Sequence, residues 1–164
     1  MNFFLWSEEL WSNALWIGIG ATLCMDAWAI LQKQLFKLPS LDYALVGRWT
    51  GLMLKGQFTH DSIASADKVR GEKAIGWILH YGIGIIFAFM HIAFWGEEWV
   101  LMPTFGAALL TGIVTTIVPY FIMQPAFGMG FAASKMPAQF SVCMRSMAAH
   151  TAYGIGIYLA AVII

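Results

Sequence analysis

The stretch Leu15–Leu31, LWIGIGATLCMDAWAIL, is long and apolar enough to cross a lipid bilayer, yet it carries one carboxylate, Asp26, inside the span. A charged side chain at that depth costs at least about 2.5 kcal/mol, so an ionisable residue within a span is by default a candidate for a functional site. Small or polar residues recur every four positions on the way to this carboxylate: Ala14, Gly18, Thr22 and Asp26. Such spacing places them on one helix face, where another backbone can approach closely. We therefore expect Asp26 to face protein rather than lipid.

The composition indicates a membrane protein. The 164 residues are 60% hydrophobic and 11% charged, with a mean hydropathy of +0.71, whereas soluble domains carry about 25% charged residues. There is no dense basic face, which argues against a nucleic-acid partner. No Lys or Arg precedes Lys33, so the start of the chain lacks the basic region of a secretory signal, and we expect the first span to be retained.

Four apolar segments account for most of the length and predict a single all-α domain, 1–164, that is an integral membrane four-helix bundle. Pro119 lies in the last third of the third segment and should kink it. The predicted spans cover residues of about 10–31, 74–95, 101–123 and 139–163.

The first long connection predicts an additional amphipathic helix over about 40–55, lying along the membrane surface or folded back on the bundle. Ser40 is the expected N-cap, Asp42 suits the positive end of the helix dipole, and Gly56 marks the C-terminal end. One face of this helix carries Leu41, Leu45, Trp49 and Leu52.

The distribution of cations predicts the orientation. Seven of the nine Lys and Arg residues lie in the first long connection, and the other two, Lys135 and Arg145, lie close to the start of the fourth span. The beginning of the chain and the Gly96–Glu98 turn carry Glu and no cation. The positive-inside rule then places both chain ends outside and the two large connections in the cytoplasm.

With this topology, polar groups of different spans reach a common depth. At 1.5 Å per helical residue, Asp26 lies about 8 Å from the cytoplasmic edge, His80 about 10 Å and His150 about 8 Å. Gln124 lies near the same edge, and Tyr120 is one turn deeper. We therefore predict a cytoplasm-facing pocket in which Asp26 is the charge centre and the two histidines are proton-linked partners. The alternative is a hydrogen-bonded cluster that only sets the register of the helices.

Further residues receive candidate roles around this pocket. Gln124 and Arg145 would orient a ligand, and Tyr120 would line the pocket. Arg48 would contact an anion from the loop helix, or simply extend its charge to water. His60 and Asp61 form a solvated turn or a lid over the pocket.

The sequence does not identify a cofactor, and we expect none. Two His and one carboxylate can hold Zn or Fe, so Asp26, His80 and His150 are candidate metal ligands, and paired axial His80 and His150 would suit a haem. No His-Glu-x-x-His spacing is present, so any such ligands would have to converge from three helices.

Several motifs together resemble a bacterial inner-membrane family, the domain-of-unknown-function family 2938. They are Asp26 in the first span, Pro39-Ser-Leu-Asp-Tyr-Ala-Leu-Val-Gly-Arg-Trp49, His60-Asp-Ser-Ile63, Gly76-Trp-Ile-Leu-His-Tyr81, Met123-Gln-Pro125, and Arg145 with His150. The resemblance covers about residues 18–159. It implies a four-span protein of the bacterial plasma membrane, with periplasmic termini by the charge rule above, and it implies no activity.

Three functions follow from these observations. The leading one is binding or translocation of a small polar solute, ion or proton through the acid/His pocket. The alternatives are a membrane-embedded enzyme acting on a lipid or quinone, and a non-catalytic assembly subunit. Because short helices with many small faces favour close packing, we also expect a homo-oligomer in the bilayer.

Overall fold

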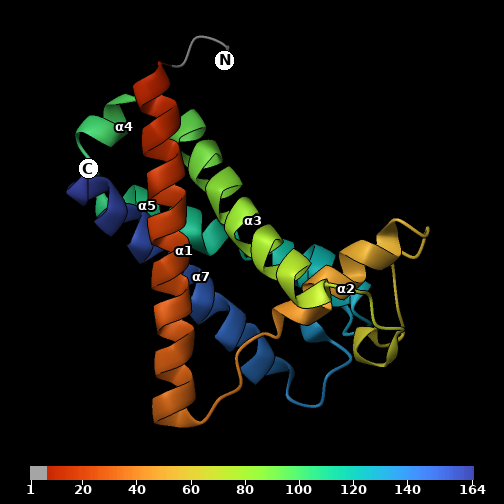
Figure 1. Cartoon of the computed structure of the whole chain (residues 1–164). Helices are drawn as coiled ribbons and strands as arrows, with labels where there is room; N and C mark the ends of the chain where they lie inside the picture. The colour runs from red at the N-terminus through yellow and green to blue at the C-terminus, as the bar shows by residue number, and fades with distance from the viewer. Residues whose placement is uncertain (1–6) are drawn as a thin grey trace.

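The computed structural model describes residues 7–164, and within this range the chain is all-helical, without a strand (Figure 1). Its α-helices are α1 (Glu8–Phe36), α2 (Tyr43–Met53), α3 (Glu72–Trp95), α4 (Glu98–Leu101), α5 (Phe105–Val114), α6 (Gln124–Ala126) and α7 (Gln139–Ile163). The other helical segments are the 3-10 helices η2 (Ile63–Ser65) and η4 (Phe131–Ala133) and the π-helical segment η3 (Pro119–Met123).

Four helical segments are long and apolar enough to cross a membrane: Glu8–Phe36, Glu72–Trp95, Phe105–Ala126 and Gln139–Ile163. The predicted all-α fold with four spans is therefore confirmed. The first helix continues to Phe36 instead of ending near residue 31, because the residues after Leu31 are compatible with a helix. It ends where Lys37 adopts a left-handed φ of 56°, two residues before Pro39.

The third span is not the single helix predicted over 101–123. It begins at Phe105 and is interrupted after Val114 by a turn and by the π-helical segment η3. Pro119 has no amide hydrogen, so the regular bond to residue 115 cannot form. The Thr115 carbonyl instead accepts from the Val118 amide at 3.1 Å. The Thr115 and Thr116 hydroxyls donate to the carbonyls of Gly112 and Ile113, each at 2.6 Å. The regular α-helix is thus interrupted in the residues before and after Pro119.

Helix α2 is shorter than the predicted 40–55, and its N-cap is Asp42, not Ser40. Asp42 adopts an extended conformation, and its Oδ1 accepts from the Ala44 amide at 3.0 Å. The helix folds back on α3, and Gly47 and Gly76 allow this contact. A Cβ at Gly47 would overlap the carbonyl of Glu72, and one at Gly76 would overlap that of Tyr43.

Small residues also set the crossings between the spanning helices. A Cβ on Gly18 would lie 2.6 Å from Cα of Ile85 in α3. A Cβ on Gly112 of α5 would lie 2.6 Å from Cα of Gly154 in α7. The small face of α1 that leads to Asp26 therefore packs on protein, as predicted.

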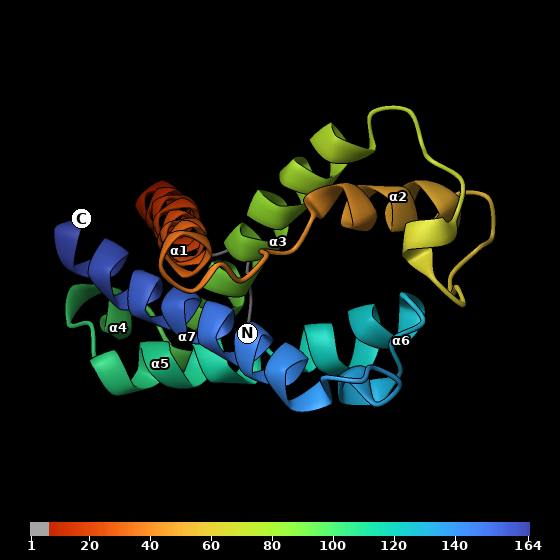
Figure 2. The same ribbon diagram turned by 90° about the horizontal axis from the view of Figure 1, so that it is seen from below.

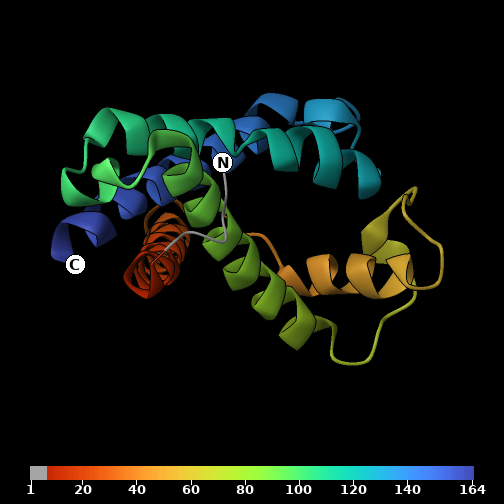
Figure 3. The ribbon, with the colours of Figure 1, turned by 90° about the horizontal axis from the view of Figure 1, so that it is seen from above.

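Helix α1 contacts both α3 and α7, and α5 packs on the other side of α7 (Figure 2). Seen from above, η3 and α6 lie across from α2 and η2 (Figure 3). This arrangement places α2, α3 and α7 around the candidate site.

Candidate functional site

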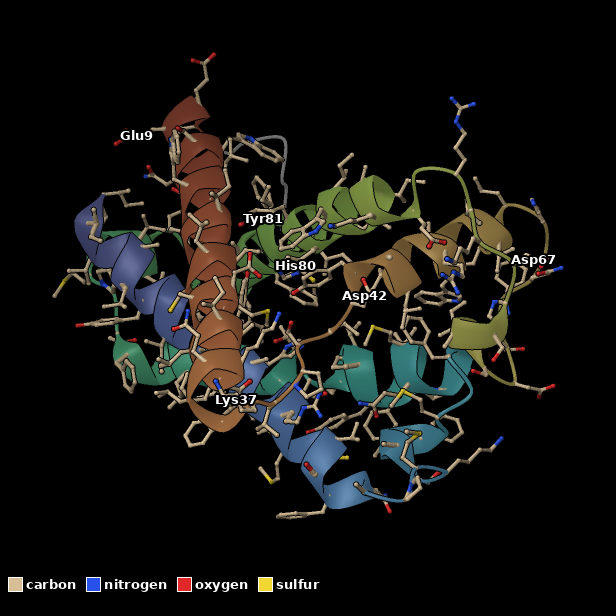
Figure 4. All side chains as sticks on the ribbon, turned by 60° about the horizontal axis from the view of Figure 1, so that its bottom comes forward. Glu9, Lys37, Asp42, Asp67, His80 and Tyr81 are labelled. Carbon is tan, nitrogen blue, oxygen red and sulfur yellow. The ribbon has the colours of Figure 1, made fainter. Side chains whose placement is uncertain are left out.

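The carboxylate of Asp26 joins α1 to α3. Its Oδ1 lies 2.9 Å from Nε2 of His80, and its Oδ2 accepts from the Tyr81 hydroxyl at 3.0 Å. Both side chains are largely buried, with 10% of His80 and 16% of Asp26 exposed. Figure 4 shows His80 and Tyr81 on the part of α3 beside α1. The charge in the first span is therefore paired inside the protein, as its cost in lipid requires.

Tyr43 of α2 completes this cluster. Its hydroxyl oxygen lies 3.0 Å from Nε2 of His80, and the two rings are stacked with centroids 4.1 Å apart. Burial raises the pKa of Tyr43, and the nearby Asp26 carboxylate raises it further. Because an ionised carboxylate only accepts hydrogen bonds, we assign the proton of neutral His80 to Nε2. Its Nδ1 has no hydrogen-bond partner among residues 7–164.

His150 of α7 is held differently. Its Nδ1 lies 2.8 Å from Oγ1 of Thr115, and the hydroxyl hydrogen of Thr115 is donated to the Gly112 carbonyl. Thr115 can therefore only accept from the imidazole, so Nδ1 of His150 carries the proton. This leaves Nε2 of His150 as an acceptor, without a partner in the described chain.

A cavity of about 420 Å³ lies among α1, α2, α3, η3, α6 and α7. His80, Gln124 and His150 line it together, and so do Arg145 and Ser146. Gln124 is 2% exposed, and its Nε2 is 3.4 Å from Oγ of Ser146. Its Oε1 is buried without a hydrogen-bond partner. Most of the remaining wall is apolar.

The structure thus brings together four of the predicted site residues, namely His80, Gln124, Arg145 and His150. Asp26 does not line the cavity; it lies behind His80 and holds it. Arg145 donates from Nη2 to the Pro39 carbonyl at 2.5 Å, which ties α7 to the connection before α2.

The other predicted residues lie elsewhere. Arg48 is buried, makes two bonds of 2.9 Å to the Glu72 carboxylate, and also donates to three carbonyls of the loop after α2. Tyr120 donates to the Cys143 carbonyl at 2.6 Å. The turn of His60 and Asp61 packs on the α6 end, where the His60 amide donates to Ala126. These four side chains are not part of the cavity wall.

The candidate metal set needs correction. Within the described chain, no group of three or more His, Cys, Asp or Glu side chains is arranged to hold a metal ion. Asp26 and His80 are bonded to each other, and Nδ1 of His150 is bonded to Thr115. Asp26, His80 and His150 are accordingly not such a group.

Sequence reasoning missed three residues of the site: Tyr43, Tyr81 and Thr115. Tyr81 directly follows His80, a signal that was available. Thr115 is followed by Thr116, and nothing in the sequence distinguishes the two, so only the packing of α7 on α5 identifies Thr115. It also missed His91, whose Nδ1 is 2.7 Å from Thr111 Oγ1 and whose Nε2 is buried without a partner.

An all-helical chain with four spans around a partly polar cavity defines a multi-pass membrane protein. The profile of the family described as "Protein of unknown function (DUF2938)" matches residues 15–164, so the chain belongs to this family. The resemblance seen in the sequence motifs is confirmed. Neither a curated protein nor a solved structure matches the chain.

Proposed function

We propose that this protein binds a small molecule in the cavity beside His80, Gln124 and His150, as a carrier or receptor of the bacterial inner membrane. The unpartnered Oε1 of Gln124 carries the proposal. A buried polar atom without a partner costs about 1–3 kcal/mol, and a ligand in the cavity would remove this cost. Pockets of this kind, mostly apolar with a few convergent polar groups, are typical of small-molecule sites.

Proton linkage is part of the proposal. A histidine side chain can gain and lose a proton, so a site with two imidazoles can couple ligand binding to proton binding. The charge distribution supports an orientation with both termini in the periplasm and the cavity open toward the cytoplasm. The predicted homo-oligomer remains a proposal, which light scattering of the purified protein tests.

A membrane-embedded enzyme acting on a lipid or quinone is the second candidate. The observation that favours it is the carboxylate-held imidazole beside a largely apolar wall. An imidazole fixed in one tautomer by a carboxylate is a common general base. Under this function, the molecule bound in the cavity would be chemically changed during incubation.

Two alanines of α1 allow a matched test. Ala29 lines the cavity, whereas Ala27 is exposed and does not. We expect small molecules extracted from polymer-bounded native discs to include a species that is present with wild type and Ala27→Phe and depleted with Ala29→Phe. Mass spectrometry of the extracts gives the comparison. Equal small-molecule content in all three proteins, each folded by circular dichroism, would contradict a ligand cavity.

A further inference from the structure

We infer that the ligand is an apolar molecule whose polar end is an uncharged hydrogen-bond donor, a hydroxyl group above all. This inference rests on the proposed binding function and adds the class of ligand to it. It follows from which polar atoms of the cavity are free and which are already bonded.

The free polar atoms are acceptors. Oε1 of Gln124 is buried and unpartnered. Nε2 of His150 is an acceptor because Nδ1 carries the proton, and Nδ1 of neutral His80 is one because Nε2 faces Asp26. A ligand that only accepts hydrogen bonds would leave these three atoms unsatisfied, whereas a donor pairs with them.

Three of the neighbouring donor atoms are already bonded within the protein. The Tyr153 hydroxyl donates to the Gly84 carbonyl at 2.5 Å, and Nε2 of Gln124 is directed at Ser146. Nη2 of Arg145 donates to Pro39. A hydroxyl group accepts as well as donates, so it can also use the donors that stay free, such as the other N–H groups of Arg145 and the hydroxyl of Ser146. A ligand that is only an acceptor would use these donors but leave the three acceptors of the cavity unpaired.

The charges around the cavity favour a hydroxyl group over an ammonium group as the polar end of the ligand. Arg145 is the one Lys, Arg, Asp or Glu side chain among the described residues of the wall, and its positive charge disfavours a cationic ligand. The opposite charge, Asp26, is outside the wall and already accepts from His80 and Tyr81. An uncharged donor avoids both costs.

The rest of the wall suits an apolar body. Phe87, Phe127 and Tyr153 present rings to the cavity, and Met25 and Met123 add flexible apolar side chains. Methionine adapts its shape to irregular ligands, and aromatic rings supply large contact areas.

Three aromatic probes of similar size test the inference: 1-naphthol, which donates a hydrogen bond, 1-methoxynaphthalene, which cannot, and 1-naphthylmethylamine, which is cationic. Binding to the protein in nanodiscs is measured by calorimetry, with empty nanodiscs subtracted. We expect 1-naphthol to bind at least about tenfold more tightly than 1-methoxynaphthalene, a difference of about 1.4 kcal/mol.

Gln124→Leu should remove most of this preference. The control is Thr116→Val, a buried polar residue of the same span that is outside the cavity wall and should keep the preference. If Gln124→Leu does not fold, the comparison of the three probes on the wild-type protein still tests the inferred ligand class.

Equal binding of 1-naphthol and 1-methoxynaphthalene would overturn the inferred ligand class while leaving a binding cavity in place. Tighter binding of the amine than of 1-naphthol would overturn the inference that the donor group of the ligand is uncharged. Absence of binding by all three probes, or binding that Ala29→Phe does not reduce, would instead contradict the proposed function itself.

Discussion

Oδ1 of Asp26 in the first span lies 2.9 Å from Nε2 of His80 in the second, and this pair is mostly buried. The carboxylate also accepts from the Tyr81 hydroxyl, so both of its oxygens are bonded. A charge within a span is thereby used to connect two helices and to orient an imidazole at the cavity.

Replacing Asp26 by Leu should destabilise the protein by about 3 kcal/mol, because the polar groups of His80 and Tyr81 lose their acceptor while they stay buried. The double change Asp26→Leu and His80→Leu should cost less than the sum of the two single changes. Equilibrium unfolding in mixed micelles gives the free energies. Strict additivity would show that the two side chains do not interact.

Arg48→Ala should destabilise the packing of α2 on α3 by about 3 kcal/mol, because the Glu72 carboxylate and three loop carbonyls lose their donor. Arg48→Lys should recover only part of this, because an ammonium group cannot make the two parallel bonds. Thermal unfolding of the three proteins provides the measurement, and an Arg48→Lys variant as stable as wild type would contradict the bidentate role.

The pKa of Arg48 predicts how its contribution to the stability of the fold depends on pH. Hydrogen bonding to Glu72 raises the pKa of Arg48 above its already high ordinary value. A raised pKa stabilises the fold at every pH below the unfolded-state pKa, and the contribution is lost only as the pH rises through the folded-state value. The stability difference between wild type and Arg48→Ala should therefore stay constant from neutral pH up to the strongly alkaline range. A difference that disappears near neutral pH would show that the Arg48 charge is not its source.

Replacement of glycine by alanine should have opposite effects on stability at two positions, Gly47 and Gly82. A Cβ at Gly47 would overlap the Glu72 carbonyl, so Gly47→Ala should separate α2 from α3 and lower the melting temperature. A Cβ at Gly82 meets no atom within 4 Å, so Gly82→Ala should be neutral or stabilise α3 by up to about 1 kcal/mol. Melting curves of both variants test this, and equal effects would contradict the close crossing of α2 and α3.

Labelling of single cysteines tests the proposed orientation. In a background of Cys24→Ser and Cys143→Ser, a cysteine replacing Lys68 should be protected from a membrane-impermeant maleimide in intact cells. A cysteine replacing Glu97 should react, because the charge rule places this turn outside. Both positions are exposed, so accessibility of the side chain itself does not limit the reaction. The reverse pattern would invert the topology.

The sequence by itself determined the fold class and the presence of four spans, and it predicts the depth of the polar residues. Hydropathy over about 20 residues reports whether a helix can cross a bilayer, and a rise of 1.5 Å per residue converts position into depth. The interruption of the helix around Pro119 was predictable because the missing amide hydrogen is a property of the residue alone.

Only the tertiary structure decided which faces meet. Periodicity did not show that Asp26 lies behind His80 instead of on the cavity wall, nor that Thr115 and not Thr116 holds His150. It also could not place Tyr43, which reaches His80 because Gly47 and Gly76 let α2 approach α3. Rotation of a helix about its axis and the distance between two helices depend on packing contacts between segments far apart in the chain, and local patterns carry little information about those contacts.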